Sequence, residues 1–115
     1  MLFLQYPPCS TCQKAKKFLD SRSAVYTDRH IKLDNPTAEE LKLWHSMSGL
    51  PLKKFFNTSG LAYKSLGLKD KLPTMSEEEQ FALLAGDGML VKRPILVGED
   101  FVLVGFKEAQ WEEKL

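Results

Sequence analysis

Cys9 and Cys12 stand three positions apart in the stretch YPPCSTCQKAKKFL and are the only cysteines in the chain. Such a pair can be a redox centre, part of a metal site or two packed thiols. On a helix, a spacing of three keeps both Cα atoms within the ~4.4–6.8 Å range that a disulfide accepts. Zinc needs two more ligands, and the only histidines, His30 and His45, fit no ordinary zinc spacing. The spacing favours redox chemistry.

The residues around Cys9 place it between a strand and a helix. LFLQY, residues 2–6, is apolar and strand-like, and Pro7 and Pro8 do not suit an interior strand. A helix is expected from Ser10, so Cys9 faces unpaired backbone N–H groups and the positive end of the helix dipole. Such positions lower a thiol pKa from ~8.5 to ~3.5–7.5. The sequence therefore predicts that Cys9 is a nucleophilic thiolate.

Cys12 is expected to point inward, because it shares a helical face with Ala15 and Leu19. A less accessible second thiol can resolve a mixed disulfide by closing the intramolecular bond. Cysteine is also among the most buried residue types, so two packing thiols remain the structural alternative.

Hydrophobic periodicity and capping signals predict the remaining elements. They are a strand at about 24–33, a helix in 34–50 with a Thr37/Glu40 capping box and a closing Gly49, a helix in 76–88 capped by Ser76 and Glu79, a hairpin in 93–106 and a helix in 107–115. Residues 51–75 read as short helical turns broken at Gly60 and Gly67. Their apolar side chains are expected to pack; they are Phe55, Phe56, Leu61, Leu66 and Leu68.

This order predicts one α/β domain, residues 1–115, with a small mixed four-stranded sheet. A βαβ unit at about 1–34 and a ββα unit at about 90–115 flank a helical insertion at about 36–86. The arrangement resembles a thioredoxin/glutaredoxin-like fold.

The composition excludes some classes of partner. A net charge of +1 gives no reason to expect nucleic acid or a membrane surface. No apolar stretch approaches the ~20 residues of a membrane span, and MLFLQYPP is too short for a signal peptide. We expect a cytoplasmic protein, where a purely structural disulfide is uncommon.

A second feature is VKRPILV, where Pro94 opens an otherwise strong interior strand. In thioredoxin-like proteins a proline at this place forms a cis peptide against the redox cysteine. Arg93 would then point towards Cys9 and bind an anionic substrate or stabilise the thiolate. A surface ion pair is the alternative for Arg93.

Four stretches together resemble the arsenate reductase (ArsC)/Spx family of thioredoxin-fold proteins, nearly end to end. They are YPPCSTCQKAKKFL, GLPLKKFFNTSGLAYKSLGL, LVKRPILV and VGFKEAQWEEKL. The chain looks closest to the small arsenate reductase-like members. The resemblance implies a thiol-dependent reductase with no bound cofactor or metal, and with glutathione, glutaredoxin or thioredoxin as electron donor.

The resemblance also assigns site residues. Cys9 matches the family nucleophile, and Arg93 with Pro94 matches the arginine and cis-proline that face it. Ser10, Thr11 and Asn57 are expected to contact the substrate.

Two further arginines hold the oxyanion in glutaredoxin-dependent arsenate reductases. They fall at about Asn57 and Gly105, and neither is arginine here. Each missing arginine removes a charge-assisted contact, so arsenate is expected to be a poor substrate.

Spx-type regulators give the alternative function. They use a Cys-x-x-Cys redox switch and bind the C-terminal domain of the RNA polymerase α subunit without reading DNA. Their C-terminal segment is longer and basic, whereas KEAQWEEKL is acidic. This difference favours the reductase.

Overall fold

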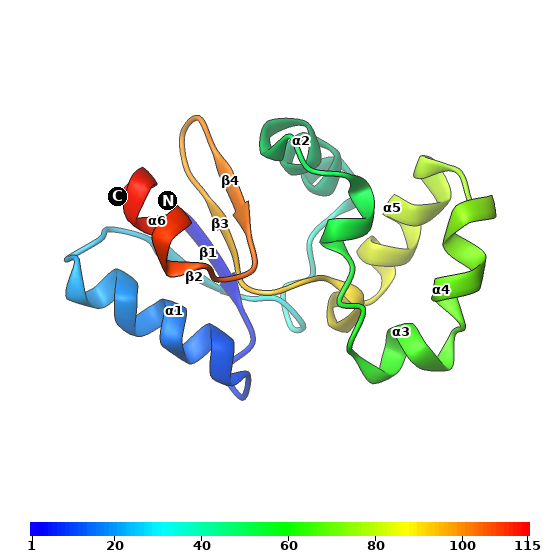
Figure 1. The fold of residues 1–115 in the computed structure, drawn as a ribbon, viewed down its shortest axis with the longest axis horizontal. Coiled ribbons are helices and arrows are strands. Elements are labelled where there is room, and N and C mark those ends of the chain that lie inside the picture. The colour runs from blue at the N-terminus through cyan, green and yellow to red at the C-terminus, as the bar shows by residue number, and fades with distance from the viewer.

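The computed structural model describes residues 1–115 and contains one four-stranded sheet in the order β2-β1-β3-β4. The strands are β1 (Leu2–Gln5), β2 (Thr27–His30), β3 (Ile95–Val97) and β4 (Val102–Val104). β1 runs parallel to β2 and antiparallel to β3, and β3 pairs antiparallel with β4 (Figure 1). The predicted mixed sheet is confirmed.

Two helices cover one face of the sheet: α1 (Ser10–Ser21) and α6 (Glu108–Lys114) (Figure 1). The buried side chains of this layer come from both strands and helices; they are Phe3, Ala15, Phe18, Leu19, Leu96 and Trp111. The indole N–H of Trp111 donates to the Gly105 carbonyl at 3.1 Å. α6 is thereby tied to the loop after β4.

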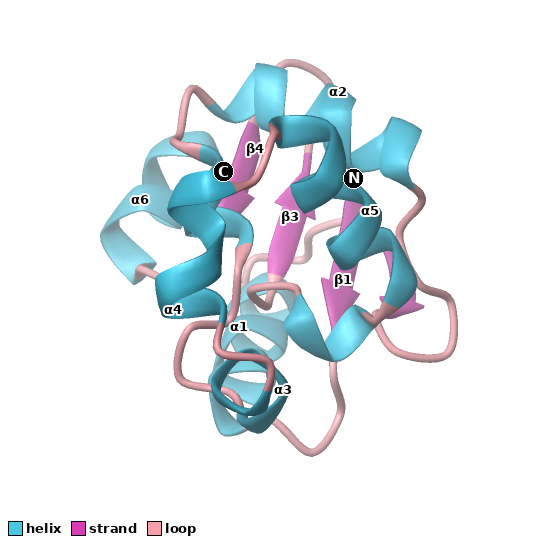
Figure 2. Cartoon of the chain, turned by 90° about the vertical axis from the view of Figure 1, so that its right-hand side faces the viewer, coloured by secondary structure: helices cyan, strands magenta, loops and turns pink.

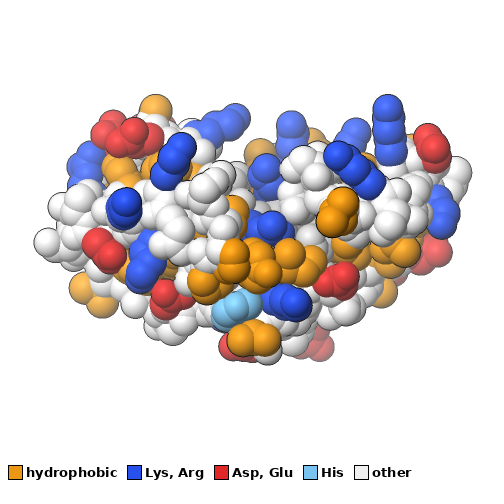
Figure 3. All heavy atoms as spheres, turned by 90° about the horizontal axis from the view of Figure 1, so that it is seen from below, with side chains coloured by type: hydrophobic (Ala, Val, Ile, Leu, Met, Phe, Trp, Pro, Cys, Tyr) orange, Lys and Arg blue, Asp and Glu red, His pale blue; other side chains and the backbone are white.

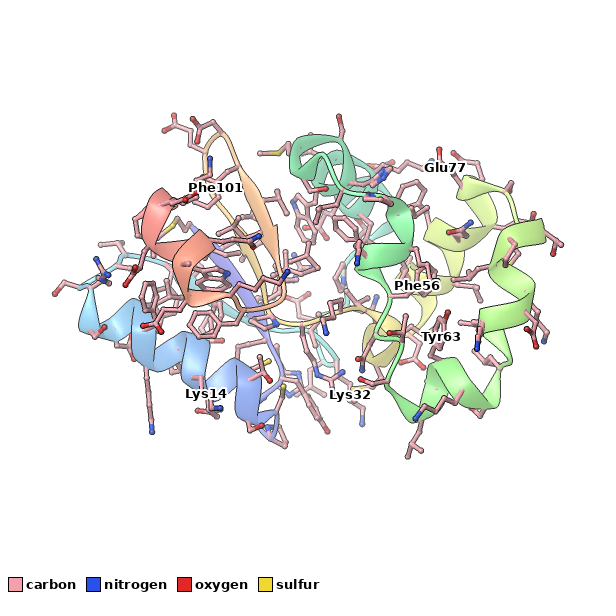
Figure 4. All side chains as sticks on the ribbon, viewed as in Figure 1. Lys14, Lys32, Phe56, Tyr63, Glu77 and Phe101 are labelled. Atoms are coloured by element: carbon pink, nitrogen blue, oxygen red, sulfur yellow. The ribbon has the colours of Figure 1, made fainter.

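The helices between β2 and β3 cover the other face. They are α2 (Ala38–Ser48), α3 (Leu61–Ser65), α4 (Leu68–Lys71) and α5 (Glu77–Gly86). The 3-10 turn Leu52–Phe55 follows α2, Leu72–Thr74 follows α4, and Gly88–Leu90 lies between α5 and β3. Figure 2 shows them in front of the sheet, with α1 and α6 behind it. Phe56 and Tyr63 meet inside this layer, with ring centroids 6.2 Å apart (Figure 4). None of the helices has the length and apolar character to cross a membrane.

Local signals fix the ends of the two longest inserted helices. Thr37 and Ser76 each accept from the backbone three residues on, at Glu40 and Glu79, and both reciprocal bonds of the capping box are present. Gly49 ends α2 with φ of +68°. The predicted caps are confirmed, and such a cap is worth about 1 kcal/mol.

Two expectations are wrong. Phe55, Phe56 and Leu68 are buried as expected, but Leu61 and Leu66 are 86% and 42% exposed and do not pack in the core. The second strand is shorter than residues 24–33, because His30 Nδ1 accepts from the backbone N–H groups of Lys32 and Leu33 and turns the chain.

Candidate functional site

Cys9 is the residue that precedes the first turn of α1, with extended backbone geometry (φ −78°, ψ 120°). Its sulfur is half-buried, while Cys12 on the first turn is fully buried, and both are free thiols. The Cys9 N–H donates to the Tyr6 carbonyl at 2.9 Å, which fixes the turn between β1 and α1. The predicted placement of both cysteines is confirmed.

The two thiols have opposite pKa shifts. Burial alone would raise the pKa of Cys9, but the backbone N–H and thiol of Cys12, together with Arg93, favour its thiolate and lower the pKa overall. The Cys9 side chain does not form a capping hydrogen bond to the first turn of α1. Burial, together with the nearby Cys9 sulfur, raises the pKa of Cys12 to about 12. The two shifts favour ionisation of Cys9 over Cys12.

Arg93 precedes a cis bond to Pro94. Its guanidinium lies over the Tyr6 ring, 5.1 Å from the centroid. The Nε and Nη1 atoms are buried and have no hydrogen-bond partner in the protein. No acidic side chain forms an ion pair with Arg93 within 4 Å, so the surface ion pair is not what holds it. Two of its donors are therefore left unused in the protein.

Tyr6 is a residue that the sequence interpretation missed. Its backbone N–H donates to the Cys12 sulfur at 3.5 Å, and its ring packs under Arg93 and against His30. An aromatic residue directly before the two prolines was the available signal, but its position beneath Arg93 depends on a contact across the sheet.

A cleft of about 850 Å³ opens beside the cysteine. Its wall contains the predicted residues Cys9, Thr11, Asn57 and Arg93, together with Gly105. Ser10 is exposed and Pro94 is buried, and neither lines the cleft.

A short backbone pairing holds the Asn57 segment beside Arg93. Phe56 bridges Val91, and the flanking bonds run from Asn57 N–H to the Leu90 carbonyl and from Lys92 N–H to the Phe55 carbonyl, each 2.7 Å. The insertion therefore forms one side of the cleft.

Four lysines that the sequence interpretation did not select also line the cleft: Lys53, Lys54, Lys92 and Lys107. Gly105 has φ of +76°, and a Cβ there would lie 3.5 Å from Lys92 Cε. Lys92 thus lies over the position where the family resemblance places an arginine. On the lower face, hydrophobic side chains gather in the middle with basic side chains beside them (Figure 3).

The histidines pack against aromatic rings. His45 lies between Phe55 and Phe81, with centroids 5.8 and 5.7 Å away. No group of three or more histidine, cysteine, aspartate or glutamate side chains is arranged to hold a metal ion.

Known structures share this architecture. The crystal structure of an ArsC family related protein from Bacteroides fragilis superposes with a TM-score of 0.95 at 67% identity, covering 97% of this chain and 94% of that one. A possible arsenate reductase from Streptococcus mutans UA159 gives 0.91 at 47% identity, covering 99% and 97%.

Sequence relatives include an uncharacterized protein and regulators. The uncharacterized protein YusI of Bacillus subtilis is 53% identical over 98% of this chain and 96% of its own length. The regulatory protein MgsR of the same organism is 29% identical over 96% and 86%. The model of the ArsC family matches residues 4–114. With its thioredoxin-like sheet, its cysteine at the start of α1 and this match along almost its whole length, the chain belongs to the ArsC family.

Proposed function

We propose that the protein is a thiol-dependent reductase that uses Cys9 as nucleophile and Cys12 as resolving thiol. The observation that carries the proposal is Arg93, which helps to lower the pKa of Cys9 and has two buried guanidinium nitrogens without a hydrogen-bond partner. Hydrogen-bond donors placed near a reacting group stabilise the negative charge that develops on the leaving group.

The first step is attack of the Cys9 thiolate on one sulfur of a substrate disulfide. The Cys9–sulfur bond forms, the substrate disulfide breaks, and its other half leaves as a thiolate that takes a proton from water. Arg93 is placed to hold a negative charge beside the reacting sulfur.

Cys12 completes the reaction. In the mixed disulfide Cys9 no longer carries a charge, so one of the causes that raise the pKa of Cys12 is removed. The Cys12 thiol loses its proton and attacks the Cys9 sulfur, which forms the Cys9–Cys12 disulfide and releases the second substrate thiol. The substrate gains two electrons, both from the protein, and two protons, one from the Cys12 thiol and one from water.

An external thiol must then reduce the Cys9–Cys12 disulfide. Two molecules of glutathione, or one reduced thioredoxin or glutaredoxin, supply the two electrons in the cytoplasm. Arsenate is a poor substrate in this proposal, because Asn57 and Gly105 offer no guanidinium to a multiply charged oxyanion.

The test is NADPH-coupled turnover with glutathione/glutaredoxin and with thioredoxin, comparing a low-molecular-weight disulfide with arsenate. Cys9→Ser is the control for thiol chemistry. Disulfide turnover that vanishes in Cys9→Ser and exceeds arsenate turnover supports the proposal. Turnover with arsenate alone contradicts the substrate assignment, and no turnover with either substrate contradicts the reductase function.

A redox-sensing regulator is the second candidate, and similarity to MgsR favours it. In that case the Cys9–Cys12 disulfide alters binding to the RNA polymerase α subunit. A pull-down of that subunit with the reduced and oxidised protein separates the candidates. Association that depends on the state of the cysteines, without disulfide turnover, supports the regulator.

A further inference from the structure

β4 is an edge strand of the sheet, and α2 packs against it. The sheet order places β4 at one end, where it pairs only with β3. At the two ends of this pairing, Gly98 N–H donates to the Phe101 carbonyl at 2.9 Å and Gly105 N–H donates to the Pro94 carbonyl at 2.8 Å. These two bonds fix which backbone groups of β4 face β3.

Hydrogen-bonded and non-hydrogen-bonded pairs alternate along an antiparallel ladder. Leu103 therefore turns its N–H and C=O towards β3, and Val102 and Val104 turn theirs outward. Neither valine forms a backbone hydrogen bond outside the sheet. Unpaired groups on an edge strand are a ready template for another extended chain.

The outward-facing backbone groups of Val102 and Val104 border the cleft that contains Cys9. Val102, Val104 and Gly105 form one wall, and residues 53–60 lie on another. The cleft volume of about 850 Å³ lies near the upper end of the ~300–1,000 Å³ range that is typical of small-molecule sites. An added strand would lie ~4.8 Å from β4 and extend towards the cysteine.

The charges around the cleft all have one sign. Five basic side chains line it and no aspartate or glutamate does; they are Lys53, Lys54, Lys92, Arg93 and Lys107. The whole chain carries a net charge of only +1, so this is a local concentration of positive charge. An acidic occupant is complementary to it.

We propose that the cleft binds an extended, acidic segment of a partner protein as an additional strand along β4, which brings a cysteine or disulfide of that segment to Cys9. The proposal deepens the proposed function, because it names the class of substrate for the same thiol. Backbone pairing with Val102 and Val104 gives affinity for any extended chain, and the lysines select for acidic side chains.

Binding is tested on the Cys9→Ser protein, so that no covalent chemistry contributes. The probe is a fluorescein-labelled synthetic peptide of alternating glutamate and threonine, measured by fluorescence anisotropy at low salt. Two peptides serve as controls: one with lysine in place of glutamate, and one with the acidic sequence and N-methyl groups on alternate backbone nitrogens. The N-methylated peptide keeps the charge and cannot pair with a strand.

The acidic peptide is expected to bind about tenfold more tightly than either control. The protein variant Lys53→Glu/Lys54→Glu should weaken binding by about tenfold, since two attractive charges become repulsive. Lys64→Glu/Lys71→Glu is the matched control, because both lysines are exposed and neither lines the cleft. It should leave the affinity within about twofold.

Equal binding of the acidic and N-methylated peptides would overturn strand addition. Binding of free glutathione together with no measurable binding of the acidic peptide would also overturn it and assign the cleft to a small thiol. Peptide binding without any disulfide turnover by the wild-type protein would support the docking proposal and refute the reductase function, so the two can fail separately.

Discussion

Replacing Cys12 by serine separates the two thiol steps. With an aromatic disulfide such as 5,5′-dithiobis(2-nitrobenzoate), the wild-type protein should release two coloured thiolates per chain, one when Cys9 attacks and one when Cys12 resolves the mixed disulfide. Cys12→Ser should release one and stop at the mixed disulfide. The hydroxyl of serine still donates towards the Cys9 sulfur, so the first step should keep its rate within about threefold.

The substitution has a cost in stability that the structure bounds. Cys12 is fully buried, and burying a hydroxyl costs ~1–3 kcal/mol in mutational data. The Tyr6 N–H, 3.5 Å from the sulfur, offers the hydroxyl a partner, which places the expected loss at the lower end, about 1–2 kcal/mol. Urea unfolding measures this loss, and stopped-flow absorbance measures the two releases.

Cys9→Ser is the matched variant. Its remaining thiol is fully buried, so it should react only through local opening of the fold and far more slowly than the wild type. A Cys9→Ser protein that reacts as fast as the wild type would show that the nucleophile has been assigned to the wrong cysteine. A second release whose rate depends on protein concentration would show that resolution is intermolecular.

Three further changes have expected outcomes. Arg93→Gln should raise the pKa of Cys9, because a positive charge that favours the thiolate is lost; rates of alkylation by iodoacetamide against pH measure this, and an unmoved profile would refute it. Hydrogen bonds from Arg29 lower the pKa of Glu40 from 4.5 to about 2, so the ion pair stabilises the fold above pH 4.5 and this contribution is lost as the pH falls towards 2. Glu40→Gln should therefore lower the free energy of unfolding by about 1–2 kcal/mol at pH 7, a figure reduced to allow for the partial exposure of the pair. In urea unfolding at several pH values, the variant should lose less stability than the wild type as the pH falls below 4.5. An equal loss in both proteins would count against the ion pair. Gly105→Ala should destabilise the protein by about 1–2 kcal/mol in the same assay, because a φ of +76° is unfavourable for a residue with a Cβ. Equal stability of the variant and the wild type would contradict this expected backbone strain.

The parts of the fold that depend on neighbouring residues were predictable from the sequence. Thr37 and Glu40 cap their helix within one turn, and Cys12 is buried because it follows the same helical spacing as Ala15 and Leu19. Cys9 could be placed at the start of α1 for the same reason. Each of these features depends only on residues a few positions away in the sequence.

The features that were missed depend on contacts between distant segments. Leu61 is apolar but lies 86% exposed on a short helix, and only the packing of the whole insertion decides that. Lys92 and Lys107 are separated along the chain, and they meet at the cleft because β4 turns at Gly105 and the insertion pairs with residues 90–92. The spacing of these lysines in the sequence does not predict that both line the same cleft.

The kind of cation in the cleft bears on what it can bind. Arginine offers a planar fork of donors that matches a compact oxyanion, whereas lysine is a point charge on a flexible stem. Here a single fork, Arg93, stands at the reacting sulfur, and the side chain over Gly105 is that of Lys92. Because a positive φ at Gly105 disfavours any other residue, an arginine could not simply replace it without backbone strain. One oriented fork with movable ammonium groups farther along suits an extended molecule whose carboxylates are spread out, with its sulfur delivered to Cys9. In the proposed function, asparagine and glycine at positions 57 and 105 would change the shape of the preferred substrate as well as remove charge-assisted bonds.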